Sequence, residues 1–243
     1  MIRDKIKDEA YFRNYLQWQR DTIKEFSDLI SKRLTETGVA DDDVKRWSLA
    51  LVDYYKELIY LLYSYGSPKN DILEAYQNYA QKALESASMP NSEGLTYSDV
   101  ELLSSLAILL DINQDSATFI DTIKNKCTDD EFNCEDIFIQ FFFRYMKFGK
   151  PMSVDDCKIQ DKGYVDLAKV LLAPETEKLE LFKEFMQKKW YKANKESPWY
   201  DFHKSKEEIY VGYWAFECAA IAKIYGFNID DIKLLPYLPI DLI

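Results

Sequence analysis

The side chain in this sequence best placed for acid–base chemistry is Glu217, a lone acid in an apolar, aromatic stretch. We predict a helix over residues 206–225, which puts Glu217 on the same face as Tyr213 and Trp214. Desolvation there would raise the pKa of the carboxyl group, as a general acid requires. The alternative is an anchor that accepts a hydrogen bond from a tyrosine, an indole N–H or a main-chain amide. Because no second catalytic group accompanies Glu217, we favour the anchor and predict no catalytic residue.

Gly212 lies one turn before Glu217 in that predicted helix. A glycine in a helix interior costs roughly 1 kcal/mol relative to alanine. We therefore expect Gly212 to mark a close backbone approach or the helix start. A ligand site is not expected there.

The other reactive side chains are few. His203 is the only histidine, has no ligand partner nearby in sequence, and is predicted to be structural. Cysteines 127, 134, 157 and 218 form no CxxC pair. In a reducing compartment we expect buried free thiols, with a disulfide as the lesser alternative and a zinc site less expected still. No metal and no cofactor are predicted.

Catalytic and nucleotide-binding motifs are absent from the sequence, which has no GxGxxG, P-loop, HExxH, GxSxG or EF-hand pattern. This weighs against an enzyme. The formal net charge of −11 disfavours direct binding of nucleic acid, which needs clustered lysine and arginine, and permits a basic partner. The one basic concentration surrounds Trp190 and Tyr191, and we predict that it is a solvated helix face. Its members are Lys183, Lys188, Lys189, Lys192 and Lys195.

The elements that must position these groups are predicted to be helices. Seven glycines and seven prolines in 243 residues are too few for the many turns of an all-β fold. The aromatic run at 138–148 has β-propensity, but its acidic start, basic end and length favour a helix. The expected helices are 9–33, one from Asp41–Asp43 through Trp47 to Leu62, 71–87, 100–110 capped by Ser98 or Asp99, 115–126, 138–148, 164–172, 175–192 and 206–225.

The first two helices should form an antiparallel hairpin because their connection is short. The fold class predicted is all-α, a multi-helix globule of antiparallel helix pairs in two helical parts packed together, with a boundary near 120–130. No apolar run reaches the length of a membrane span, and the charged N-terminal residues do not resemble a secretory signal. We therefore expect a cytoplasmic protein with no membrane partner.

Three groups of acids could form a binding surface for a basic partner, or could simply cap helices and solvate loops. Asp230 and Asp231, which follow the capping residue Asn228, are expected to be structural. The candidate acids are Asp41, Asp42, Asp43, Asp129, Asp130, Glu131, Glu135, Asp136, Asp155 and Asp156.

The C-terminal third carries a distinctive set of aromatic residues, glycine, proline and acids. The set comprises Trp190, Tyr191, Trp199, Tyr200, Gly212, Tyr213, Trp214, Glu217, Pro236, Tyr237 and Asp241. With a looser N-terminal match at Arg3–Lys5 and Tyr11–Phe12, the sequence resembles the PoNi immunity proteins, which counter PoNe-type DNase toxins. The chain departs from the usual tyrosine-rich ending at Leu238 and Ile240. We interpret the motif residues as a structural frame.

The resemblance implies an N-terminal region of PoNi type over 1–125 and a C-terminal one over 126–243. It further implies a cytoplasmic immunity protein of a polymorphic toxin system associated with type VI secretion. Such a protein would bind a secreted PoNe-type DNase stoichiometrically and block its active site without turnover. The acidic side chains are expected to face the toxin. The alternative is a helical-repeat-like adaptor or regulator that binds another protein or peptide.

Overall fold

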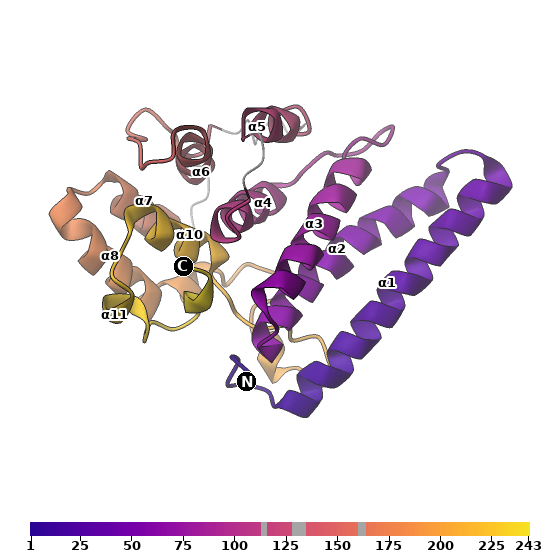
Figure 1. Cartoon of the computed structure of the whole chain (residues 1–243), viewed down its shortest axis with the longest axis horizontal. Coiled ribbons are helices and arrows are strands. Elements are labelled where there is room, and N and C mark those ends of the chain that lie inside the picture. Colours follow the sequence, from indigo (N-terminus) through magenta and orange to yellow (C-terminus); the bar gives the residue numbers. More distant parts are fainter. Residues whose placement is uncertain (113–115, 128–134, 160–163) are drawn as a thin grey trace. The chain divides into compact units, whose positions relative to one another are not determined.

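The computed structural model describes residues 1–112, 116–127, 135–159 and 164–243, and these residues are helices and loops (Figure 1). Asp136 and Lys158 form an isolated bridge, and these described residues contain no strand. The predicted all-α class is confirmed. Within the same ranges, no helix combines the length and apolar character needed to cross a bilayer. The chain divides into two compact units, residues 1–94 with 201–213 and residues 95–200 with 214–243.

The first unit is built on three long helices, α1 (Glu9–Thr37), α2 (Asp42–Tyr65) and α3 (Lys69–Ser86). α1 packs against α2, and α2 against α3 (Figure 1). A short turn that contains Gly38 joins α1 to α2, which confirms the predicted helical hairpin. The aromatic and aliphatic stripes meet in the core, where Phe12, Ile59 and Tyr79 have no exposed surface.

Two irregular segments complete this unit. The main-chain N–H groups of Arg3 and Asp4 donate to the carbonyl of Ser64 at 2.9 and 3.2 Å. The hydroxyl group of Tyr210 donates to Asp4 at 2.7 Å, and the Tyr11 hydroxyl group donates to the carbonyl of Tyr210 at 3.0 Å. Residues 201–213 are therefore held against the start of the chain, although they are about 200 positions away in sequence.

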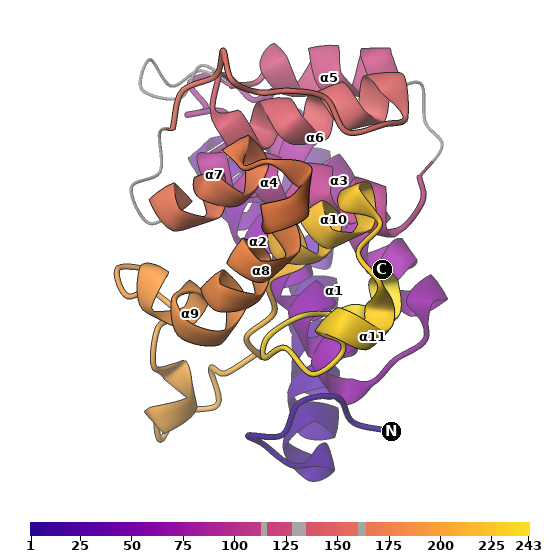
Figure 2. The same ribbon diagram turned by 90° about the vertical axis from the view of Figure 1, so that its left-hand side faces the viewer.

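The second unit has a core of short helices. α4 (Tyr97–Leu109) is apolar almost all round and is buried, as predicted, against α6 (Ile137–Phe148) and α10 (Phe216–Tyr225). Phe138, Phe141 and Phe142 of α6 have no exposed surface, and the helix predicted there is confirmed. α5 (Ser116–Lys124) lies beside α6 (Figure 2). The remaining helices are α7 (Val165–Leu172), α8 (Glu175–Lys188), α9 (Trp190–Ala193) and α11 (Ile229–Ile232), with 3-10 turns at Phe202–Lys204 of the first unit and Ile240–Leu242.

Several predicted helix ends differ from the structure. Thr96, and not Ser98 or Asp99, caps α4: its hydroxyl group accepts from the Asp99 N–H at 3.2 Å, and Asp99 accepts from the Thr96 N–H at 3.2 Å. The helix predicted over 175–192 is interrupted at Lys189, where φ is −120° and ψ is −39°. Asp115, the predicted start of another helix, lies outside the described residues.

The helix predicted over 206–225 is wrong in its first half, because α10 begins only at Phe216. Residues 209–215 form no helix, and Gly212 has φ +111°, a value that favours glycine. Their carbonyls and N–H groups bond elsewhere: the Val211 carbonyl accepts from the Ser64 hydroxyl group at 2.7 Å, and the Ala215 N–H donates to the Tyr237 carbonyl at 2.8 Å. These tertiary bonds replace the hydrogen bonds that a helix would supply.

Candidate functional site

Glu217 is buried in the second unit and is bonded from three sides. Its carboxylate Oε1 accepts from the indole N–H of Trp190 at 2.6 Å, from the Tyr164 hydroxyl group at 3.3 Å and from the Cys218 thiol at 3.3 Å. The predicted indole and tyrosine partners are both present. The predicted helix face is wrong, because Tyr213 and Trp214 precede α10 and Glu217 lies in its first turn.

The electrostatics of this cluster suit an anchor. Burial raises the pKa of Glu217, and the hydrogen bonds from Trp190, Cys218 and Tyr164 oppose that rise. Burial also raises the pKa of Tyr164 and of Cys218. Only 7% of the Glu217 side chain is exposed, and its close donors belong to the core. The carboxyl group therefore holds the indole of Trp190 within the core.

Trp190 is the centre of an aromatic stack that joins distant parts of the second unit. Its ring lies 5.9 Å from that of Trp199 and 4.8 Å from that of Tyr237. Tyr191 stacks on Tyr200 at 4.6 Å and on Tyr237 at 5.6 Å. Five of the aromatic residues singled out in the sequence thus meet in one cluster, which supports their interpretation as a frame.

The remaining motif residues include Tyr213, Trp214, Pro236 and Asp241. Tyr213 belongs to the first unit, where its hydroxyl oxygen accepts from the His203 N–H at 3.2 Å and lies 2.8 Å from His203 Nδ1. Trp214 is half-buried, and Pro236 and Asp241 are exposed. His203 therefore has a structural partner, as predicted.

The acids at the start of α2 are paired with bases. Asp41 caps the helix by accepting from the Val44 N–H at 3.2 Å, and it accepts from Arg33 at 2.7 Å. These two bonds lower the pKa of Asp41. Asp42 lies 3.5 Å from Lys45, and Asp43 lies 2.7 Å from Arg46. Exposed pairs of this kind stabilise little and leave the charges accessible.

The second predicted group, Asp155 and Asp156, is also organised by local partners. Asp156 forms a two-pronged pair with the guanidinium group of Arg144, with both N–O distances 2.8 Å. This pairing lowers the pKa of Asp156 to about 2. Asp155 accepts from the Ser153 hydroxyl group at 2.7 Å. Cys157 is half-buried beside Arg144, and burial raises the pKa of its thiol.

The third group is split by burial. Asp136 is completely buried, where it caps α6 and accepts from the Tyr97 hydroxyl group at 3.0 Å, so it serves the fold. Glu135 is exposed and pairs with Lys158 at 3.1 Å. Asp129, Asp130 and Glu131 lie outside the described residues, as does Cys134.

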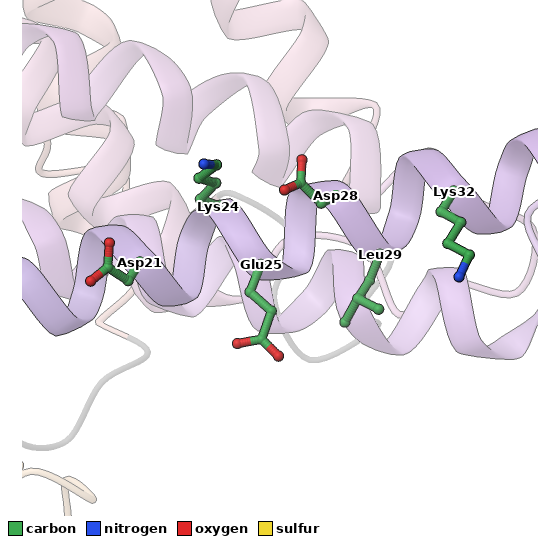
Figure 3. A pocket seen from close by; sticks show the side chains of 6 residues that line it. All are labelled: Asp21, Lys24, Glu25, Asp28, Leu29 and Lys32. Carbon is green, nitrogen blue, oxygen red and sulfur yellow. The ribbon is translucent and has the colours of Figure 1, made fainter.

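The described surface includes hollows in both units. One is an open groove along α1, lined by Asp21, Lys24, Glu25, Asp28, Leu29 and Lys32 (Figure 3). Another lies in the second unit, over the buried rings of Tyr164 and Phe185, with Lys188, Lys189 and Lys192 in its lining. Lys189 lies 3.5 Å from Asp166 and 3.4 Å from Glu184, so part of the basic charge is neutralised locally. The described residues contain no group of three potential metal ligands.

Family comparison accounts for most of the chain. A family model described as "PoNe immunity protein (PoNi), N-terminal" matches residues 3–120, and one described as "PoNe immunity proteins (PoNi), C-terminal" matches residues 134–242. The chain belongs to the PoNi family. No curated protein and no solved structure gives a significant match. The residues that the C-terminal model matches include Glu217, Trp190 and the aromatic stack around them.

Sequence reasoning missed the bases that neutralise the candidate acids. Arg33, Arg144 and Lys158 lie 8, 12 and 23 positions from their acidic partners. Helical spacing of three or four residues reveals none of these three pairs. It does predict the Asp42–Lys45 and Asp43–Arg46 pairs.

Replacing Glu217 by glutamine should change how stability depends on pH. The folded protein raises the pKa of Glu217, so this group contributes most stability below its unfolded pKa and loses that contribution as pH rises through the folded pKa. Glutamine can still accept from Trp190 and does not titrate. The free energy of unfolding of Glu217→Gln relative to wild type should therefore rise from pH 4 to pH 7.5, as measured by urea unfolding.

Trp190→Phe provides the matched comparison, because it removes the indole donor that lowers the pKa of Glu217. Its loss of stability with pH should be steeper than that of wild type. A pH-independent difference between Glu217→Gln and wild type would contradict the assignment of a buried, titrating anchor.

Proposed function

We propose that this protein binds a PoNe-type DNase toxin one to one, covers its active site without turnover, and protects the cell that makes it. The observation that carries the proposal is the match of both PoNi models, in order, to residues 3–120 and 134–242. The proposal includes a cytoplasmic location and a toxin delivered by type VI secretion. Neither of these follows from the helical fold itself.

The charge distribution supports a basic partner. Residues 99–136 contain ten acids and two lysines, so most of the net charge of −11 comes from this short part of the chain. A nuclease must bind phosphate groups and therefore presents lysine and arginine around its active site. An acidic inhibitor is attracted to such a surface over several ångströms, which raises the association rate.

We propose that the toxin contacts the candidate acids that lie at the surface. Asp129, Asp130 and Glu131, which are outside the described residues, are included. Asp136 is left out because its carboxylate is buried and bonded to Tyr97. The local pairs with Arg33, Arg144 and Lys158 can exchange for pairs with the toxin, because each is partly solvated. The set is Asp41, Asp42, Asp43, Asp129, Asp130, Glu131, Glu135, Asp155 and Asp156.

Nuclease protection tests the proposal. Increasing amounts of this protein should suppress plasmid cleavage by the cognate PoNe toxin domain, with protection complete near one equivalent. A stoichiometric inhibitor has this saturation point, whereas an enzyme that inactivates the toxin would act below it. If a large excess of this protein gives no protection, and the protein instead binds another cellular protein, the adaptor alternative is favoured.

Charge reversal tests the acidic surface. Asp42→Lys with Asp43→Lys, and separately reversal of Asp129–Glu131, should each slow toxin association about tenfold at low salt, with a smaller effect at high salt. Asp41 is spared because it caps α2. Stopped-flow fluorescence would give the rates.

The matched control is the double reversal of Asp230 and Asp231, another adjacent acidic pair in the first turn of a helix. It should change the association rate less than threefold. If both test reversals behave like this control, these acids do not face the toxin.

A further inference from the structure

The first unit has an exposed tryptophan whose ring packs on other aromatic rings. Trp18 of α1 is 51% exposed, which is unusual for so large an apolar side chain. Its ring lies 5.6 Å from Tyr15 and meets the ring of Tyr54 edge to face at 6.2 Å. Phe26 also meets the Tyr54 ring edge to face, at 5.3 Å. The exposed ring is therefore held in one position before any partner binds.

The charged groups around these rings are acidic. Burial raises the pKa of Tyr54, and the carboxylates of Glu57, Asp53 and Glu25 raise it further. Glu57 also raises the pKa of Tyr15. The rings thus lie in a negative field, which is where a cation binds most strongly to an aromatic face.

The side chain of Glu25 lies on the same face of α1 as Trp18, so both can contact one partner. Residues 18 and 25 are seven positions apart, so they lie on one face of α1. In Figure 3, Glu25 and Leu29 point to the same side of the helix, and Lys24 and Asp28 point away from it. Glu25 is exposed and has no ion-pair partner among the described residues, in contrast to Asp41, Asp42 and Asp43.

Glu57 is a partly buried acid beside these aromatic rings. Its carboxylate accepts from the side-chain amide of Gln19 at 3.2 Å, and burial raises its pKa. Gln19 also donates to the main-chain carbonyl of Tyr54 at 2.7 Å, so the amide that binds the Glu57 carboxylate is itself held on α2. This arrangement is typical of a preorganised binding surface, in contrast to a flexible acidic loop.

We propose that Trp18, Tyr54, Glu25 and Glu57, the Trp18 patch, receive an arginine or lysine side chain from the DNA-binding surface of the toxin. The proposal rests on the proposed function, because it takes the toxin as the partner. The cation lies over the indole ring of Trp18, and the two carboxylates bind its N–H groups. Tryptophan with surrounding polar contacts is the composition of an interface hot spot. The toxin uses such cations for phosphate, so their capture competes directly with DNA.

Binding measurements with two variants test the Trp18 patch. Trp18→Ala removes the aromatic face, and Glu25→Lys reverses the charge beside it. Each should weaken binding of the cognate toxin domain at least tenfold at about 0.15 M salt, where charges more than about 8 Å away are screened. Biolayer interferometry with immobilised toxin would give the dissociation constants.

Matched controls lie on the same helices. Asp28→Lys makes the same charge change on the other side of α1, and Leu49→Ala removes an exposed apolar side chain of α2. Both should stay within threefold of wild type. Circular dichroism confirms that each variant is folded, and Glu25→Lys decides the question if Trp18→Ala unfolds.

The two proposals fail in different ways. If wild-type protein does not bind the toxin, the proposed function is wrong. If wild type binds and both Trp18→Ala and Glu25→Lys match the controls, the function stands and the Trp18 patch is overturned.

Discussion

The second unit depends on one buried hydrogen bond, from the indole of Trp190 to the carboxylate of Glu217. A carboxylate is costly to bury unless donors surround it, and three core side chains supply them here. In return, the bond fixes Trp190 between the rings of Trp199 and Tyr237. Residues 190–200 and the C-terminal tail have little regular structure, so this stack gives them a defined position on the helical core.

Local rules predicted the long helices well because apolar stripes, caps and terminal glycines agree there. α1 and α2 carry a clear stripe, Asp41 caps the second helix, and Gly38 and Gly66 end both. Residues 206–215 were wrongly predicted to be helical. Their aromatic and apolar residues follow the spacing of a helix, but the segment does not form one. Bonds to Tyr11 and Ser64, about 150 to 200 positions away, hold this segment in an irregular conformation, and no local pattern contains that information.

The same limit applies to the proposed binding surface. The sequence located the acids and the aromatic frame, but it could not show which acids are solvated. Asp136 looked like Glu135 in the sequence, yet one is buried under Tyr97 and the other is exposed. The exposure of Trp18 could not be predicted from the sequence, because an aromatic residue on an amphipathic helix is normally assigned to the core. Its exposure, and the carboxylates around Tyr54, emerge only when α1 and α2 are packed together.

Under the proposed function, this protein is an inhibitor that uses two physical means. The net charge of the protein would attract a basic partner from a distance, and the proposed Trp18 patch would stabilise the close contact. Competition between this protein and DNA for the toxin tests the central claim most directly. With a catalytically inactive toxin and a fluorescent DNA duplex, the account predicts that one equivalent of this protein displaces the duplex completely. A ternary complex, with toxin holding protein and duplex together, would contradict it.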